Sequence, residues 1–173
     1  MLFLLFAIVD ACTITKHETL TFEDINIPGS YFALPRPYHN YIFRRSQPNN
    51  NYPDDNIPVS NTSNQGGPWA NAAQSKPNVI FTTGESLSIR KADNSSFKIR
   101  HIAMTSIFIA NMSVFVNTYR NGTLHSAMNV TLALGVPTTY KIYKCKIDQV
   151  LIGCVNGSFN TCAHIAYDNV AVR

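Results

Sequence analysis

Apolar and polar residues alternate along much of the chain after residue 77, with a period of two rather than the longer period of a helix. This alternation indicates β-strands with one buried face. The predicted strands, in order, are HETLTFEDI, YHNYIFRR, NVIFTT, SLSIRK, SFKIRHIAMTSIFIA, MSVFVNTYR, TLHSAMNVTLAL, TTYKIYKC, DQVLIG and AHIAYDNVAV. About ten short strands with turn residues between them predict an all-β sandwich or barrel.

One hairpin can be predicted in more detail, around the sequence TYRNGTLH. Asn121-Gly122 favours a two-residue type I′ turn, in which both central residues have positive φ. With regular pairing on either side, Phe115 lies opposite Met128. The expected inward residues of the second strand are Leu124, Met128, Val130 and Leu132, whereas Asn129, Val114 and Val116 are expected on the outer face.

The segment from residue 47 to residue 77 is rich in Asn, Pro, Ser and Gly and predicts one long loop. The first nine residues, MLFLLFAIV, are too few to span a bilayer but fit the apolar core of a signal peptide, with cleavage after Ala11. A lipidated Cys12 and a truncated start of the chain are open alternatives. We therefore expect a signal peptide over 1–11, a single β-sandwich domain over 12–173 and no transmembrane segment.

The composition favours an extracellular protein over a nucleic-acid-binding one. The net charge is +4 and the basic residues are spread thinly, without the dense basic face or the motif that nucleic-acid binding requires. Glycosylation sequons occur at Asn61, Asn94, Asn111, Asn121, Asn129 and Asn156. Together with the apolar leader, they predict a secreted or extracellular glycoprotein.

The cysteines Cys12, Cys145, Cys154 and Cys162 have no zinc-site spacing. In an oxidising compartment disulfides are the default. Cys154 and Cys162 flank the turn-rich sequence VNGSFNT and are expected to bridge it, which leaves Cys12 for Cys145. The other two connectivities stay open.

Acidic residues stand at both ends of the chain where apolar strands are expected. Asp168 interrupts IAYDNVAV and Glu23 follows LTF. A buried carboxylate needs a hydrogen bond, an opposite charge or a metal ion. If the first and last strands are neighbours, Glu23 and Asp168 could together hold a structural Ca²⁺, which prefers oxygen ligands. The alternative is that Asp168 accepts hydrogen bonds from nearby turn N–H groups and Glu23 is exposed.

The sequences LTFEDI and IAYDNVAV resemble the paired end strands of galactose-binding-like jelly-roll β-sandwiches, the fold of many carbohydrate-binding modules. The segments SKPNVIF, ADNSSFKI and TYRNGTLH are similar to motifs of related uncharacterised secreted domains. The resemblance implies a jelly-roll sandwich of two antiparallel sheets, a structural calcium ion and a glycan or extracellular surface partner. Ring stacking on a sugar would then fall to Trp69, Tyr31, Tyr38 or Tyr41.

Signatures of catalysis are mostly missing from the sequence, including the nucleophile elbow, the HExxH zinc motif, the P-loop and the dinucleotide fingerprint. The expected function is therefore a secreted or cell-surface binding module, carbohydrate-binding-like, without catalysis of its own. An alternative is a structural or adhesion glycoprotein domain without a glycan ligand. A small β-fold hydrolase or lyase is a third, less favoured reading.

Overall fold

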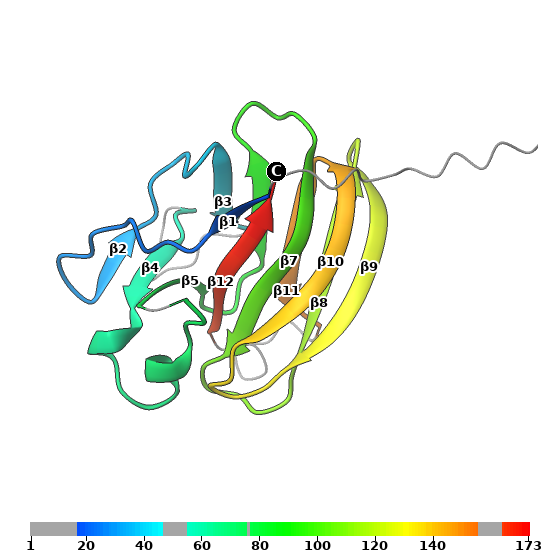
Figure 1. The fold of residues 1–173 in the computed structure, drawn as a ribbon. Coiled ribbons are helices and arrows are strands. Elements are labelled where there is room, and N and C mark those ends of the chain that lie inside the picture. The colour runs from blue at the N-terminus through cyan, green and yellow to red at the C-terminus, as the bar shows by residue number, and fades with distance from the viewer. Residues whose placement is uncertain (1–16, 47–54, 76, 156–163) are drawn as a thin grey trace, which may run out of the picture.

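The computed structural model describes residues 17–46, 55–75, 77–155 and 164–173. The described chain forms two antiparallel β-sheets stacked as a sandwich (Figure 1), which confirms the predicted fold class. No α-helix occurs among the described residues, and none of their helices has the length and apolar character needed to cross a membrane.

Seven strands form the larger sheet in the order β10-β7-β12-β5-β4-β2, with β1 added beside β12. They are β1 (Glu18–Leu20), β2 (Tyr31–Ala33), β4 (Pro58–Asn61), β5 (Asn78–Thr82), β7 (Phe97–Ser106), β10 (Thr138–Ile147) and β12 (Ile165–Val172). The five-stranded sheet has the order β3-β6-β11-β8-β9. Its strands are β3 (Tyr41–Arg45), β6 (Leu87–Lys91), β8 (Met112–Arg120), β9 (Thr123–Leu132) and β11 (Gln149–Cys154).

The main core lies between the two sheets and is built by the expected alternation. On β6, Leu87 and Ile89 are fully buried, whereas Ser88 is half-buried and Arg90 is exposed on the opposite face. The five-stranded sheet therefore has one apolar inner face and one outer face that carries polar side chains.

A second, smaller apolar cluster covers the outer side of the seven-stranded sheet. It consists of Trp69, Ala72, Ala73, Val79, Phe81, Ile107 and Ala166. Trp69 belongs to a short 3₁₀ helix, η2 (Gly67–Asn71), and its ring lies edge-on to Phe81 at 5.1 Å between centroids. Because both faces of the sheet are covered here, all residues of β5 and most residues of β12 are buried, and these strands do not alternate between buried and exposed positions.

The segment predicted as one long loop is more structured than expected over its described part. Strand β4, a second 3₁₀ helix η1 (Thr62–Asn64) and η2 all fall within 55–75. β4 pairs with β5 and β2, so this segment extends the larger sheet. The sequence did not predict β4 because this strand has only four residues and lies in a segment of low hydrophobicity.

The predicted hairpin is present, but its register is wrong beyond the turn. β8 and β9 pair Tyr119 with Leu124, as expected, and then Thr118 with Ser126. His125 is therefore an extra residue on β9, which is a β-bulge. No residue type in this stretch announces the bulge, so the sequence predicted regular pairing.

The one-residue shift exchanges the faces of the strand segments around it. Met128 lies opposite Val116 rather than Phe115. Val114 and Val116, predicted to face outward, are fully buried, and Leu124, predicted to face the core, is 53% exposed. Beyond the bulge, the inward prediction for Met128, Val130 and Leu132 is confirmed, since all three lie in or against the main core.

Candidate ligand-binding surface

Three of the four aromatic residues predicted to stack on a sugar lie in the cores. Trp69, Tyr38 and Tyr41 are 8%, 6% and 3% exposed, and burial raises the pKa of the Tyr41 hydroxyl to about 12. A buried ring offers no face to a ligand. Of the four, only Tyr31 is accessible, at 50% exposure. It lies on the short edge strand β2, and the centroid of its ring is 5.6 Å from that of Phe81.

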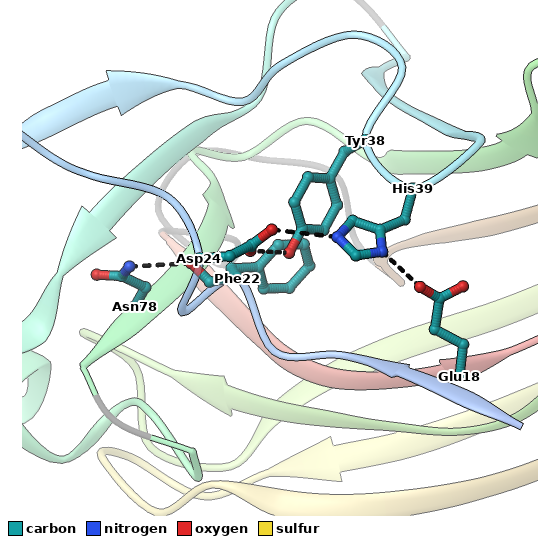
Figure 2. Close-up of polar contacts among 6 residues, drawn as sticks. All are labelled: Glu18, Phe22, Asp24, Tyr38, His39 and Asn78. Atoms are coloured by element: carbon teal, nitrogen blue, oxygen red, sulfur yellow. Dashed lines mark hydrogen bonds and ion pairs between the residues drawn. The ribbon is translucent and has the colours of Figure 1, made fainter.

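Tyr38 is held by a polar network that joins residues 18–24 to the turn before β3 (Figure 2). Its hydroxyl donates to Asp24 Oδ1 at 2.5 Å, and its ring stacks on Phe22 at 5.2 Å between centroids. Burial, followed by the bond to Asp24, raises the pKa of Tyr38. The same bond is the main reason why the pKa of Asp24 is lowered. Tyr38 is thus a structural anchor.

His39 lies between two acidic groups in the same network (Figure 2). Its Nε2 is 3.1 Å from Asp24 Oδ2, and its Nδ1 contacts Glu18 Oε1. The interaction with Asp24 and then that with Glu18 raise the pKa of His39. His39 and Asn40 both have positive φ, as a type I′ turn between Tyr38 and Tyr41 requires. The network therefore fastens β1 to this turn.

Asp168 sits where β12 exchanges one neighbour for another. Tyr167 is the last residue paired with β5, and Val170 is the first paired with β1. The expected contact between the first and last strands is thus present. Between them the register shifts and Asn169 has a φ of 45°, so the strand bulges at this point.

The donors around Asp168 explain how a carboxylate that is 1% exposed can be accommodated. Oδ2 accepts hydrogen bonds from the backbone N–H groups of Gln74 (2.8 Å) and Ser75 (2.7 Å). The Ser75 hydroxyl lies 2.8 and 2.9 Å from its two oxygens, and the Asn169 N–H donates to Oδ1 at 2.7 Å. These donors match the alternative in which nearby turn N–H groups satisfy Asp168, although Glu23, which that alternative expected to be exposed, is half-buried.

Glu23, the predicted partner of Asp168 in a calcium site, accepts a hydrogen bond from the Asn78 N–H at 3.1 Å. Partial burial is the largest cause of its raised pKa, and the negative charge of Asp168 adds to it. The two acids are therefore close enough to repel. Within the described residues, no three His, Cys, Asp or Glu side chains are arranged to hold a metal. A calcium ion between Glu23 and Asp168 stays a prediction.

The predicted modification sites are only partly within the described chain. Asn94, Asn111, Asn121 and Asn129 are exposed, Asn61 is half-buried, and Asn156 lies outside the described residues. Cys145 and Cys154 are disulfide-bonded. Their predicted partners Cys12 and Cys162 also lie outside the described residues, so the pairing stays a prediction, as do the glycans.

A hollow of about 520 Å³ lies against the outer face of the five-stranded sheet, over β3, β6 and β11. Its volume falls within the range of small-ligand sites. The lining residues are Ile42, Arg44, Arg45, Ser46, Ser88, Arg90, Lys91, Asn94, Gln149 and Leu151. No sequence prediction pointed to this face.

Strand register explains why these side chains gather. β3 pairs Arg44 with Ser88 of β6, and Leu151 of β11 pairs with Ser88 from the other side. Two residues farther along the same strands, and so on the same face, Ile42 pairs with Arg90. Residues paired across neighbouring strands point to the same face, so these five share one surface. A single sequence shows the alternation on each strand but not which strands are neighbours.

A chain of hydrogen bonds crosses the hollow. Arg90 Nη2 donates to Gln149 Oε1 at 2.7 Å, and Gln149 Nε2 donates to Ser88 Oγ at 2.8 Å. The Gln149 amide thus ties the central strand β11 to β6 and fixes one side of the Arg90 guanidinium. Polar groups held in this way on a sheet are better preorganised than groups on a loop.

The charge of the lining is of one sign. Arg44, Arg90 and Lys91 are cationic, and no described lining residue is acidic. Arg45 is buried, 3.9 Å from Glu85. Asp55, beside the hollow, lies 3.3 Å from Arg44 Nε and 2.8 Å from Arg36 Nη1, so it is shared between two arginines. The hollow therefore presents guanidinium, amide and hydroxyl groups with an excess of positive charge.

No protein-family model and no curated protein matches this chain. Among solved structures, the chain is similar to part of an exo-beta-agarase (10% identity, TM-score 0.43), covering 91% of this chain and 25% of that one. It thus spans about a quarter of that enzyme. It is also similar to the K1 cleaved adhesin domain of Lys-gingipain from Porphyromonas gingivalis W83 (11% identity, TM-score 0.40, 92% and 98% coverage). Both likenesses concern the β-sandwich alone.

Proposed function

We propose that this chain is an extracellular binding module that holds a glycan in the hollow over β3, β6 and β11. The observation that carries the proposal is the lining itself: Ser88, Arg90 and Gln149 are linked by hydrogen bonds beside the apolar side chains of Ile42 and Leu151. Sugars present hydroxyl groups along the edges of the ring and C–H groups on its faces. A site with polar groups around an apolar floor suits both.

Binding rather than hydrolysis fits this surface best. Glycoside hydrolysis commonly uses two carboxyl groups on opposite sides of the scissile bond. The described lining of the hollow offers none, and Asp55, which contacts the lining residue Arg44, is shared with Arg36. The proposal of an extracellular location rests on the apolar leader and on the exposed sequon residues Asn94, Asn111, Asn121 and Asn129.

A glycan array with the purified domain tests the proposal. Protein from a eukaryotic secretory host, with its own glycans removed by endoglycosidase, should bind a subset of the array. Gln149→Ala should weaken that binding because it removes the amide that spans β6 and β11, whereas Thr131→Ala, on exposed β9, should not. An array with no signal for the folded wild type would contradict the proposal, and so would equal binding by Gln149→Ala.

A second candidate function is an adhesion contact with another protein. Phe108, Leu134 and Val136 are 54%, 40% and 54% exposed, and Ser106 and Leu134 form a β-bridge that brings the two segments together. Large exposed apolar side chains gathered in this way are typical of protein contacts. Loss of cell binding in Phe108→Ser but not in Gln149→Ala would favour this function over the glycan proposal.

A further inference from the structure

We propose that the saccharide held in the hollow is acidic, and that its carboxylate or sulfate group binds between Arg90 and Arg44. This inference rests on the proposed function and adds the chemical class of the ligand. Three features support it: the placement of the cations, the hydrogen bond that orients Arg90, and the apolar side chains beside them.

The register brings two guanidinium groups to neighbouring positions. Arg44 is paired with Ser88, and Arg90 lies two residues farther along the same strand. Arg44 and Arg90 are therefore diagonal neighbours on adjacent strands, and residues in such positions are about 7–8 Å apart, within reach of long side chains. Lys91 also borders the hollow, but it pairs with Tyr41 and so follows the opposite face of β6 from Arg90. Like charges this close repel one another, and an oxyanion between them would relieve the repulsion.

The single carboxylate of Asp55 does not neutralise both Arg44 and Arg90. It contacts both Arg36 and Arg44 but is not part of the lining, and its pKa is lowered chiefly by Arg36. One acid thus serves two arginines, whereas no acid among the described residues forms an ion pair with Arg90. An anionic ligand is therefore favoured over a neutral or cationic one.

Arg90 is the better oriented of the two arginines. A guanidinium has five N–H donors in a rigid fork that matches the two oxygens of a carboxylate or of a sulfate. The described side-chain contact of Arg90 is the single bond from Nη2 to Gln149, which leaves donors for a ligand. Because Gln149 is itself held by Ser88, little freedom is lost when the ligand binds.

The apolar residues distinguish a saccharide from a simple anion. Ile42 and Leu151 are half-buried in the same lining and offer C–H surface to the face of a sugar ring. Ser46 and Ser88 supply hydroxyl groups for ring hydroxyls. The combination matches a uronic-acid or sulfated saccharide.

Titration calorimetry on the deglycosylated full domain tests the inference with three hexasaccharides of equal length: an oligogalacturonate, a sulfated galactan fragment without uronic acid, and a neutral galacto-oligosaccharide. The two acidic arms distinguish a carboxylate from a sulfate ligand. At least one should bind about tenfold more tightly than the neutral one, which corresponds to about 1.4 kcal/mol. That preference should shrink between 50 and 200 mM salt, because partly exposed charges are screened.

The variants locate the effect. Arg90→Gln should weaken acidic binding about tenfold, and Arg90→Lys, which keeps the charge but loses the fork, should weaken it less. Arg100→Gln is the matched control, since this exposed arginine of β7 lies on the other sheet, over the ring of Tyr143. Arg44→Gln serves as a second variant if Arg90→Gln does not fold, as judged by circular dichroism.

Equal binding of neutral and acidic saccharides, unaffected by Arg90→Gln, overturns this inference and leaves the glycan-binding proposal in place. Equal losses in Arg90→Gln and Arg100→Gln also overturn it, because they would show only a general effect of net charge. A single-stranded hexanucleotide that binds as tightly as the acidic saccharides would likewise overturn it. Absence of binding to all three saccharides also overturns this inference, and the glycan array then decides whether the proposed function stands.

Discussion

Replacing Asp168 should reveal how much stability one buried carboxylate contributes when backbone donors surround it. Asp168→Ala would leave the N–H groups of Gln74, Ser75 and Asn169 and the Ser75 hydroxyl without their acceptor. A hydrogen bond to a charged group contributes about 1.5–3 kcal/mol, and a buried donor left unpaired costs about 1–3 kcal/mol.

The four losses do not add, because Ser75 is half-buried and Gln74 exposed, so water can reach part of the site. If two donors stay unpaired, the free energy of unfolding falls by about 3–5 kcal/mol. For a chain of this length, 1 kcal/mol shifts Tm by about 2–4 °C, so Tm should fall by about 6–20 °C. Asp168→Asn keeps the shape of the side chain but presents an amide N–H₂ to N–H donors, so its Tm should fall by a smaller but clear amount.

Urea and thermal unfolding followed by circular dichroism measure both variants, with Asp93→Asn as the matched control. Asp93 accepts a hydrogen bond from the Ser95 N–H in an exposed turn, so its replacement should leave Tm unchanged within error. Wild-type stability in Asp168→Asn would contradict this prediction, and so would equal losses of stability in Asp168→Asn and Asp93→Asn.

Three further predictions concern the turn, the histidine network and the metal ion. Gly122→Val should lower stability by about 1–2 kcal/mol in urea unfolding, because Gly122 has a φ of 71° and a β-branched residue resists this conformation; an unchanged midpoint would contradict this. Because the pKa of His39 is raised, its stabilising effect should be complete below its ordinary pKa of 6.5 and lost as pH rises through the raised value, a loss that a pH series of melts should find absent in His39→Asn. If Ca²⁺ binds between Glu23 and Asp168, calcium at 100 times its Kd should stabilise the wild type by about 2.7 kcal/mol and Glu23→Gln by much less; melts of the wild type that are identical in calcium and in chelator would exclude the ion.

The sequence predicted most strands of the fold because alternation on each strand depends on local residues. It located β6, β8, β11 and β12. The pairing of the first and last strands, which was assumed because it is common in sandwiches, is present as well. The extra residue His125 could not be predicted, since a bulge depends on how two strands fit together. Strand β4 was missed because its four residues show almost no alternation.

The candidate site was harder to predict than the fold. Trp69 and Tyr38 carry the chemistry of sugar stacking, but η2 and the Asp24 network place them in the cores. The hollow forms only when Arg90 and Gln149, which are 59 residues apart in sequence, meet across two paired strands. The alternation in SLSIRK indicated that Ser88 and Arg90 share a face, but not that β11 lies beside them.

Amide chemical-shift mapping shows where a ligand binds without altering the protein. Nitrogen-15-labelled, deglycosylated domain is titrated with the acidic hexasaccharide that binds most tightly. We expect the largest shifts on Ser88, Arg90 and Gln149, on the outer face of the five-stranded sheet. Largest shifts around Tyr31 on β2 or around Phe108, with β6 and β11 unchanged, would contradict it.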